Sequence, residues 1–241
     1  MCYALANEGA STVVLDRNAE GADAVASKIK RGGGKAISVN ADVQSIEHLR
    51  AMADEVMSTF GQLNILVNNA EARMIKGFLE HTKEDWDSML GINLSGPFHC
   101  SQAIVPKMVA SGGGSIINIC SIASYMGRPN RCAYVAAKSG LLGLTRTMAI
   151  DLAPKNIRVN GISPGMIASP FNQRFSESEE TRVAWANDNL IGRWGNSNDI
   201  NGAVVFLASE ESSFITGSDI KVDGGWLAAR ARIGEEAILS D

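Results

Sequence analysis

The sequence lacks the features that mark a membrane, secreted or nucleic-acid-binding protein. Its 241 residues contain no apolar run near the roughly 18 residues that a membrane span needs. Residues 1–8 lack the basic start of a signal peptide. The 22 basic and 26 acidic residues give a formal charge of −4, and the basic residues are dispersed rather than clustered. We therefore expect a cytoplasmic protein that binds small molecules and neither nucleic acid nor membrane.

Cysteine and histidine are also scarce, and neither forms a ligand pattern. The cysteines show no metal or redox spacing, so we interpret them as free thiols of a reducing cytosol. The histidines form no ligand pair, and the sequence predicts no metal site. The residues concerned are Cys2, Cys100, Cys120, Cys132, His48, His81 and His99.

What the chain does contain is a regular alternation of strand-like and helix-like segments. Apolar residues make up 45% of the sequence, which is enough for a sizeable core. Strands are expected at 12–15, 36–39, 64–68, 115–120, 157–161 and 219–222, and helices at 20–31, 46–60, 83–110, 134–153 and 199–209. This alternation predicts a parallel sheet with right-handed crossovers and helices on both faces. We expect one α/β domain over residues 1–241, a Rossmann-like doubly wound sheet, with an unassigned tail at 228–241.

Two glycine triplets, at 32–34 and 112–114, each fall between a predicted helix and the next strand. Phosphate-binding glycine loops lie instead between a strand and the helix that follows it. We therefore interpret both triplets as helix stops.

The most informative pattern is Tyr134-Val-Ala-Ala-Lys138, with Ser121 thirteen residues upstream. In a helix, Tyr134 and Lys138 leave the same face about one turn apart. Ser121 follows a β-branched strand, so it lies at a strand end where open α/β sheets bind ligands. An ammonium favours the ionised phenol, so we expect the pKa of Tyr134 to lie below its usual value of about 10. The trio can then exchange a proton with a carbonyl oxygen.

With four further motifs in the same order, the chain resembles the short-chain dehydrogenase/reductase family. The resemblance covers residues 3 to 226 and implies hydride transfer between C4 of a nicotinamide and the carbon of a secondary alcohol or ketone. It also implies a homo-oligomer, a dimer or tetramer, formed through the helices at 83–110 and 134–153. The further motifs are Asn68-Asn69-Ala70, Ile-Asn93-Leu-Ser-Gly-Pro, Pro164-Gly165-Met166-Ile167 and Val222-Asp-Gly-Gly225.

The resemblance implies a role for each catalytic residue. Tyr134 is the general acid/base, and Ser121 donates a hydrogen bond to the substrate oxygen. Lys138 holds the nicotinamide ribose hydroxyls. Asn93 sits at a helix kink whose freed carbonyl anchors a water between Lys138 and solvent; the alternative is a solvent-facing Asn93. Ser124 is a second strand-end hydroxyl, but its spacing of ten residues from the tyrosine does not match.

The resemblance also implies a dinucleotide site. Asp16 ends the first visible strand and would bind the adenosine ribose hydroxyls. Its carboxylate repels a 2′-phosphate, so NAD is favoured over NADP, although Arg17 could pair with that phosphate. The remaining cofactor residues would be Asp42, Val43, Asn69, Ala70, Ile167 and Ser169, beside Tyr134 and Lys138. Two alternatives stay open: Asp42 caps the helix at 46–60, and 164–167 is an ordinary turn.

The chain departs from the family pattern in two places. The glycine fingerprint precedes the ribose-binding carboxylate by about 20 residues, so the family's first strand, this fingerprint and the start of its helix would lie before residue 1. We expect either a fragment of a longer enzyme or mis-started gene model, or a short form that folds and works differently. Glu71 stands where the family usually has glycine and could crowd the cofactor or repel its phosphates. The alternative function is therefore an impaired or non-catalytic oligomer partner that no longer binds dinucleotide.

By position, residues 171–195 resemble the family's substrate lid. The alternative is that they form a surface helix and loop.

Overall fold

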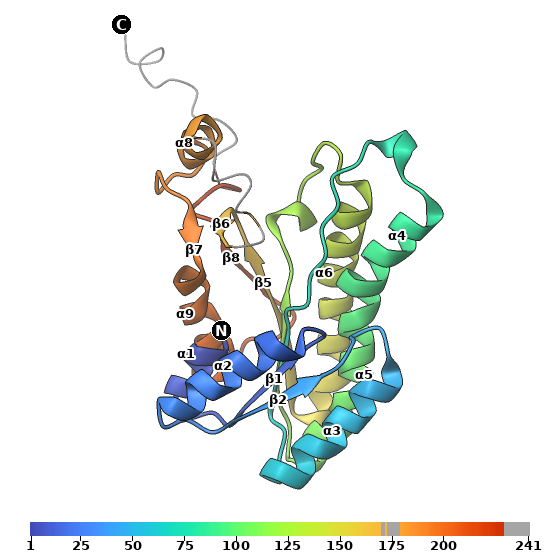
Figure 1. Ribbon diagram of the computed structural model, residues 1–241, viewed down its shortest axis with the longest axis vertical. Coiled ribbons are helices and arrows are strands. Elements are labelled where there is room, and N and C mark those ends of the chain that lie inside the picture. Colours follow the sequence, from blue (N-terminus) through green and yellow to red (C-terminus); the bar gives the residue numbers. More distant parts are fainter. Residues whose placement is uncertain (170–171, 173–178, 229–241) are drawn as a thin grey trace, which may run out of the picture.

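Parallel strands with helices on both faces make up the molecule (Figure 1). The structure is a computed structural model that describes residues 1–169, 172 and 179–228. One sheet pairs β1 (Thr12–Asp16) with β2 (Ala36–Asn40), and a second has the order β3 (Ile65–Asn68), β4 (Gly114–Ile119), β5 (Ile157–Pro164), β8 (Asp219–Val222). All these pairs are parallel. The short strands β6 (Ile167–Ala168) and β7 (Gly195–Asn196) form a separate pair.

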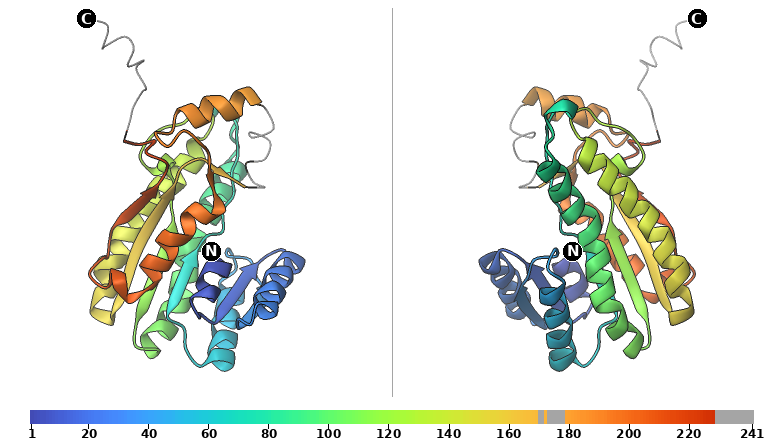
Figure 2. Two further views of the ribbon diagram at one scale, coloured as in Figure 1. Left: turned by 90° about the vertical axis from the view of Figure 1, so that its left-hand side faces the viewer. Right: turned by 90° about the vertical axis from the view of Figure 1, so that its right-hand side faces the viewer.

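The helices bury apolar stripes against the two faces of the larger sheet. The core on one face joins α3, α5 and α6 to Ile116 and Val159, and the core on the other joins α9 and α1 to Ile117 and Ile162. Figure 2 shows α9 in front of the sheet in its left view and α6 in its right view. No described helix is long and apolar enough to cross a membrane. The helices are α1 (Cys2–Asn7), α2 (Ala19–Arg31), α3 (Ile46–Phe60), α4 (Lys83–Leu90), α5 (Gly96–Ala110), α6 (Cys132–Leu152), α8 (Glu179–Asn187) and α9 (Ser197–Ala208).

The predicted doubly wound α/β fold is confirmed, and most of the element boundaries agree within two residues. The largest difference is in β5, which runs three residues past its predicted end because Gly161–Pro164 pairs with β8. The predicted helix at 83–110 is divided into α4 and α5 by a π-helical turn, Gly91–Ser95. Within 171–195 the structure describes residue 172, α8 and the segment after it. The rest of that range and residues 229–241 of the tail lie outside the described residues.

The two sheets are not hydrogen-bonded to each other. In the described ranges β1 pairs with β2 alone and β3 with β4 alone, so one side of each strand has no ladder partner. The carboxyl ends of β1 and β3 therefore face the ligand-binding edge from separate sheets.

The glycine triplet at 112–114 makes a turn that no other residue type could make here. Gly113 and Gly114 have φ angles of 115° and 152°. A Cβ on Gly113 would lie 2.1 Å from the Asn156 carbonyl oxygen, and one on Gly114 would lie 1.9 Å from that of Asn64. The triplet thus joins α5 to β4 at close backbone approaches, which agrees with its interpretation as a helix stop.

Truncating Leu49 tests the packing of α3 against the sheet. Leu49 is fully buried, whereas Leu79 is 94% exposed, so the same change at both positions separates cavity cost from surface effects. We expect Leu49→Ala to lower the free energy of unfolding by about 2–5 kcal/mol and Leu79→Ala by less than about 0.5 kcal/mol. Urea denaturation followed by circular dichroism measures both, and equal losses would contradict this core.

Candidate active site

Three polar side chains meet where β4 ends and α6 begins. Ser121 follows β4, and Tyr134 and Lys138 lie one turn apart on α6. Tyr134 is 5% exposed and Lys138 only 1%. The Lys138 Nζ donates a hydrogen bond of 2.8 Å to the Ile119 carbonyl and lies 5.8 Å from the centroid of the Tyr134 ring. The structure therefore brings together the three residues that the sequence pattern selects.

Glu71 lies directly on this group. Its Oε1 accepts a hydrogen bond of 3.0 Å from the Tyr134 hydroxyl, and its Oε2 lies 3.8 Å from the Lys138 Nζ. Arg73 forms an ion pair of 3.1 Å with the same carboxylate. The Glu71 side chain thus contacts both the tyrosine and the lysine.

Asn93 holds the segment that carries Glu71. It is fully buried in the π-helical turn between α4 and α5, so the solvent-facing interpretation is wrong. Its Nδ2 donates to the carbonyl oxygens of Ala72 (2.9 Å) and Met89 (3.0 Å), and its Oδ1 accepts from the Ala72 amide at 3.3 Å. The expected helix irregularity is present, and the amide side chain pins the backbone between Glu71 and Arg73.

The environment raises the pKa of Tyr134. Burial is the main cause and the Glu71 carboxylate the second, while Lys138, Arg73 and a hydrogen bond with Ser121 act in the opposite direction. The predicted lowering of this pKa is therefore wrong, because a sequence reading of the lysine alone omits burial and Glu71. At neutral pH the phenol keeps its proton, which is the state that donates to a carbonyl oxygen.

A small cavity opens beside these groups, and arginines line it. Ser121 and Tyr134 both face it, which gives a substrate oxygen two hydroxyls to contact. The arginines were not selected from the sequence, although Arg128-Pro-Asn-Arg131 lies in the loop between Ser121 and Tyr134. The other lining residues include Arg73, Met166, Asn172 and Trp185.

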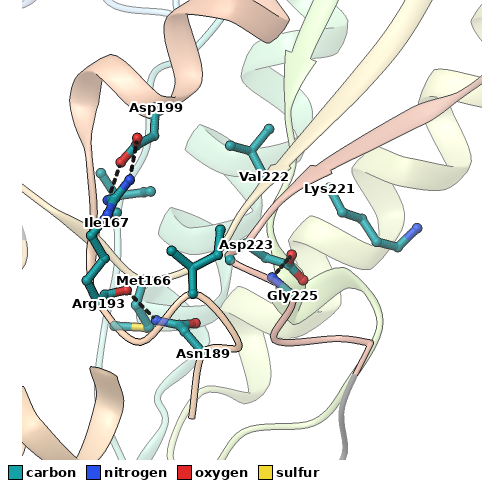
Figure 3. A pocket seen from close by; sticks show the side chains of 12 residues that line it. Met166, Ile167, Asn189, Arg193, Asp199, Lys221, Val222, Asp223 and Gly225 are labelled. Carbon is teal, nitrogen blue, oxygen red and sulfur yellow. Dashed lines mark hydrogen bonds and ion pairs between the residues drawn. The ribbon is translucent and has the colours of Figure 1, made fainter. Parts of the chain in front are cut away.

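A larger cavity, of about 370 Å³, lies between the β5–β6 turn, the segment after α8 and the end of β8 (Figure 3). Arg193 pairs with Asp199 at 2.8 Å on its wall, and Asn189 donates to the Arg193 carbonyl at 2.9 Å. Tyr134, Ser121 and Lys138 do not line it. We therefore assign the chemistry to the smaller cavity.

The predicted adenosine-binding residues lie at the carboxyl ends of β1 to β3. Asp16 is exposed, and one carboxylate oxygen accepts from the Asn18 amide at 2.9 Å. The Asp42 carboxylate accepts from the Gln44 amide at 2.9 Å, with Val43 beside it. Ser45 caps α3, so the capping role considered for Asp42 is wrong. Asn69 and Ala70 are exposed after β3.

The predicted nicotinamide-binding residues lie in and directly after the short strand β6, where Ile167 lines the larger cavity. Ile167 begins β6, and its carbonyl accepts from the Asn172 Nδ2 at 2.7 Å. Ser169 follows β6 and is partly exposed. The exposed acceptors at the adenosine end suit a dinucleotide. At the nicotinamide end, Glu71 contacts Tyr134 and Lys138, the residues that would hold the nicotinamide ribose. These two residues can therefore bind the ribose only when the Glu71 side chain rotates away.

The fold is a parallel α/β sheet, and a serine, a tyrosine and a lysine meet at the carboxyl end of β4. This combination indicates an NAD(P)-dependent oxidoreductase. Comparison with known proteins gives the family. Residues 1–227 match the model described as enoyl-(acyl carrier protein) reductase. The chain is 36% identical to cyclopentanol dehydrogenase of Comamonas sp., over 94% of this chain and 91% of the relative. The chain therefore belongs to the short-chain dehydrogenase/reductase family.

Two further relatives agree with this assignment. The chain is 41% identical to 2-dehydro-3-deoxy-D-gluconate 5-dehydrogenase of Escherichia coli, over 81% of this chain and 78% of the relative. A gluconate 5-dehydrogenase from Burkholderia cenocepacia, solved with NADP and tartrate, superposes with a TM-score of 0.90 at 35% identity. That match covers 95% of this chain and 89% of the relative.

Removing the charge of Glu71 tests the cause of the raised pKa. We expect Glu71→Gln to lower the pKa of Tyr134, because it removes the nearest negative charge while keeping the side chain's size. Tyrosinate absorbance during an alkaline titration measures this, with Tyr134→Phe to assign the signal and Glu84→Gln, an exposed position, as control.

The same titration has a defined effect on stability. The folded state holds the Tyr134 proton more tightly than the unfolded state, whose pKa is about 10. The stability that this provides is complete below that pH and is lost as pH rises toward the folded-state pKa. Glu71→Gln should make this alkaline loss smaller, and an unchanged slope would contradict the contact.

Proposed function

We propose that this chain interconverts a secondary alcohol and a ketone, with Tyr134 as the residue that moves the proton. The supporting observation is that the Tyr134 and Ser121 hydroxyls line one cavity above the buried Lys138 ammonium. The Ser121 hydroxyl hydrogen-bonds the substrate oxygen, and the lysine favours the charge that forms on the tyrosine. When bound, the dinucleotide supplies or accepts the hydride. In this proposal the backbone carbonyl of Asn93 anchors a water between Lys138 and solvent.

We propose NAD as the dinucleotide. Asp16 is an exposed carboxylate at the end of β1, where it would accept from a free 2′-hydroxyl and repel a 2′-phosphate. The comparisons leave this choice open, since solved relatives include a gluconate 5-dehydrogenase with NADP and a 7α-hydroxysteroid dehydrogenase with NADH. A lower dissociation constant for NADPH than for NADH would refute the choice.

The substrate is proposed to be a small polar hydroxy compound. The names of the relatives range from cyclopentanol to 3-oxoacyl-carrier-protein and gluconate, so they favour no single class. The cavity beside Tyr134 is small and carries arginines, which suits a polar substrate better than a long apolar one. Turnover of a steroid alcohol without turnover of any small polyol or hydroxy acid would refute this.

A homo-oligomer in the cytoplasm is proposed as the working form. Apolar side chains are exposed on the two long helical segments: Trp86 on α4, Phe98 on α5 and Ile150 on α6, the last 74% exposed. All four cysteines are free, as suits a reducing compartment. Light scattering of the purified chain gives its mass, and a monomer at micromolar concentration would refute the dimer or tetramer.

One observation favours the second candidate, a chain that no longer binds dinucleotide. The Glu71 carboxylate contacts Tyr134 and Lys138, which are the groups proposed to hold the nicotinamide ribose. Its negative charge would also oppose the approach of the cofactor's phosphates. If Glu71 stays in place, the chain keeps the fold of the family without its cofactor.

A fluorescence titration with NADH separates the two candidates. We expect saturable binding by the natural chain, and binding about tenfold tighter or more by Glu71→Gly, because the glycine removes both the bulk and the charge. Glu84→Gly on the exposed face of α4 is the control for a lost carboxylate. No binding by either the natural chain or Glu71→Gly at millimolar NADH would refute the oxidoreductase and leave the non-catalytic candidate.

Turnover tests the proton carrier separately. With NAD and any secondary alcohol that the chain oxidises, Tyr134→Phe should lower kcat by about 10²–10⁴-fold because the proton has no carrier. Tyr125→Phe, a partly exposed phenol bonded to Asp219 outside the cavity, is the matched control. A Tyr134→Phe rate near that of the natural chain would show that another group moves the proton.

A further inference from the structure

The cavity beside Tyr134 is lined by three guanidinium groups. Arg73, Arg128 and Arg131 share it with the two hydroxyls proposed to hold the substrate oxygen. Proton transfer between a tyrosine and a carbonyl needs none of these charges. Arg73 is paired with Glu71, so part of the positive charge is already compensated.

Arg128 is held by a sulfur atom and two aromatic rings rather than by a carboxylate. Its Nη1 donates to the Met166 sulfur at 3.6 Å, a weak acceptor, and in the part of the chain that the structure describes no carboxylate pairs with it. Its Cζ lies 5.0 Å from the ring centroid of Trp226 and 5.2 Å from that of Trp185. The guanidinium is partly buried against two indole rings, with most of its donors unused by these contacts.

This placement is costly unless an anion joins it. Burial and the nearby charge of Arg73 lower the pKa of Arg128 and outweigh the opposite effects of Tyr134 and Asp188, so its charged form is disfavoured there. The two indoles offset part of that cost through cation–π contacts, but they accept no N–H···O bonds. A planar fork of donors held by flat rings is suited to a planar anion that binds two N–H groups at once.

We propose that Arg128 binds a carboxylate of the substrate, so that the chain acts on hydroxy acids or their oxo acids. The proposal rests on the proposed function, because the hydroxyl or keto carbon of the same molecule would lie at Tyr134 and Ser121. Arg128 is then a specificity-determining residue: it selects the charge of the substrate, while Tyr134 and Ser121 contact the oxygen at the reacting carbon. All three residues line the same cavity, so one molecule can contact them together.

A carboxylate fits the charge of this site better than a phosphate ester does. The Glu71 carboxylate lies at the same site and repels any anion that enters. That repulsion grows with the charge of the ligand, and a phosphate ester carries between one and two negative charges near neutral pH. A monoanionic carboxylate can therefore pair with Arg128 while being repelled less by Glu71 than a phosphate ester would be.

Equilibrium binding tests the proposal without requiring turnover. Tryptophan fluorescence is a direct readout, because Trp185 and Trp226 flank the guanidinium. The probes are three monoanions, lactate, glycerate and gluconate, each compared with a neutral partner of equal chain length, propane-1,2-diol, glycerol and sorbitol. We expect at least one acid to bind saturably and its neutral partner about 10- to 100-fold more weakly.

Three variants assign that preference to Arg128. Arg128→Gln should weaken binding of the acid to the level of its neutral partner. Arg128→Lys should retain part of the preference for the acid, because lysine keeps the positive charge but lacks the paired N–H donors of the guanidinium. Arg50→Gln, an exposed position on α3, removes the same charge elsewhere and should change nothing. Thermal melting of each variant separates lost binding from lost folding.

The outcomes separate this proposal from the proposed function. Acid and neutral partner binding equally, no probe binding, or Arg128→Gln retaining the preference would each overturn the carboxylate subsite, whatever the NADH titration gives. Tighter binding of glycerol 3-phosphate than of glycerate would overturn it in favour of a phosphate subsite. Selective acid binding would support the subsite even where neither the natural chain nor Glu71→Gly binds NADH, the result that refutes the oxidoreductase.

Discussion

The buried ammonium of Lys138 is the constraint on which the site depends. A charge with 1% exposure is tolerated only with hydrogen bonds and opposite charge around it. The Ile119 carbonyl supplies a hydrogen bond from the end of β4, and the Glu71 carboxylate supplies negative charge at 3.8 Å. The Tyr134 hydroxyl donates to the same carboxylate at 3.0 Å, so its proton affinity depends on the same charges. The Lys138 ammonium, carried by α6, thus contacts both the end of β4 and the loop after β3.

Hydrogen bonds from a buried side chain fix the loop after β3. The buried Asn93 amide takes both backbone groups of Ala72, which fixes the two residues on either side of it. One of these, Glu71, accepts a hydrogen bond from the Tyr134 hydroxyl, and the other, Arg73, forms an ion pair with Glu71. A family member with glycine at the first of these positions would leave the tyrosine and the lysine open to a ligand. Here a ligand has to displace an internal carboxylate first.

Much of the fold could be predicted from the sequence because the signals were local and repeated. Strand and helix periods, the glycine turn at 112–114 and the i, i+4 spacing of Tyr134 and Lys138 each follow from neighbouring residues. The proton affinity of Tyr134 could not be predicted, since it depends on burial and on a carboxylate 63 positions away in the chain. The same holds for Arg128, whose indole neighbours come from α8 and from the segment after β8. Long-range contacts decided what local patterns could not.

The contact between Glu71 and Tyr134 is the interaction that most directly sets the proton affinity of this site. A double-mutant cycle in the free energy of unfolding measures it, with Glu71→Gln, Tyr134→Phe and the combined variant compared in urea at neutral pH. A hydrogen bond from a buried phenol to a carboxylate predicts a coupling energy of about 1–2 kcal/mol. Additivity within about 0.3 kcal/mol would mean that the two side chains do not interact in solution, and would contradict the account.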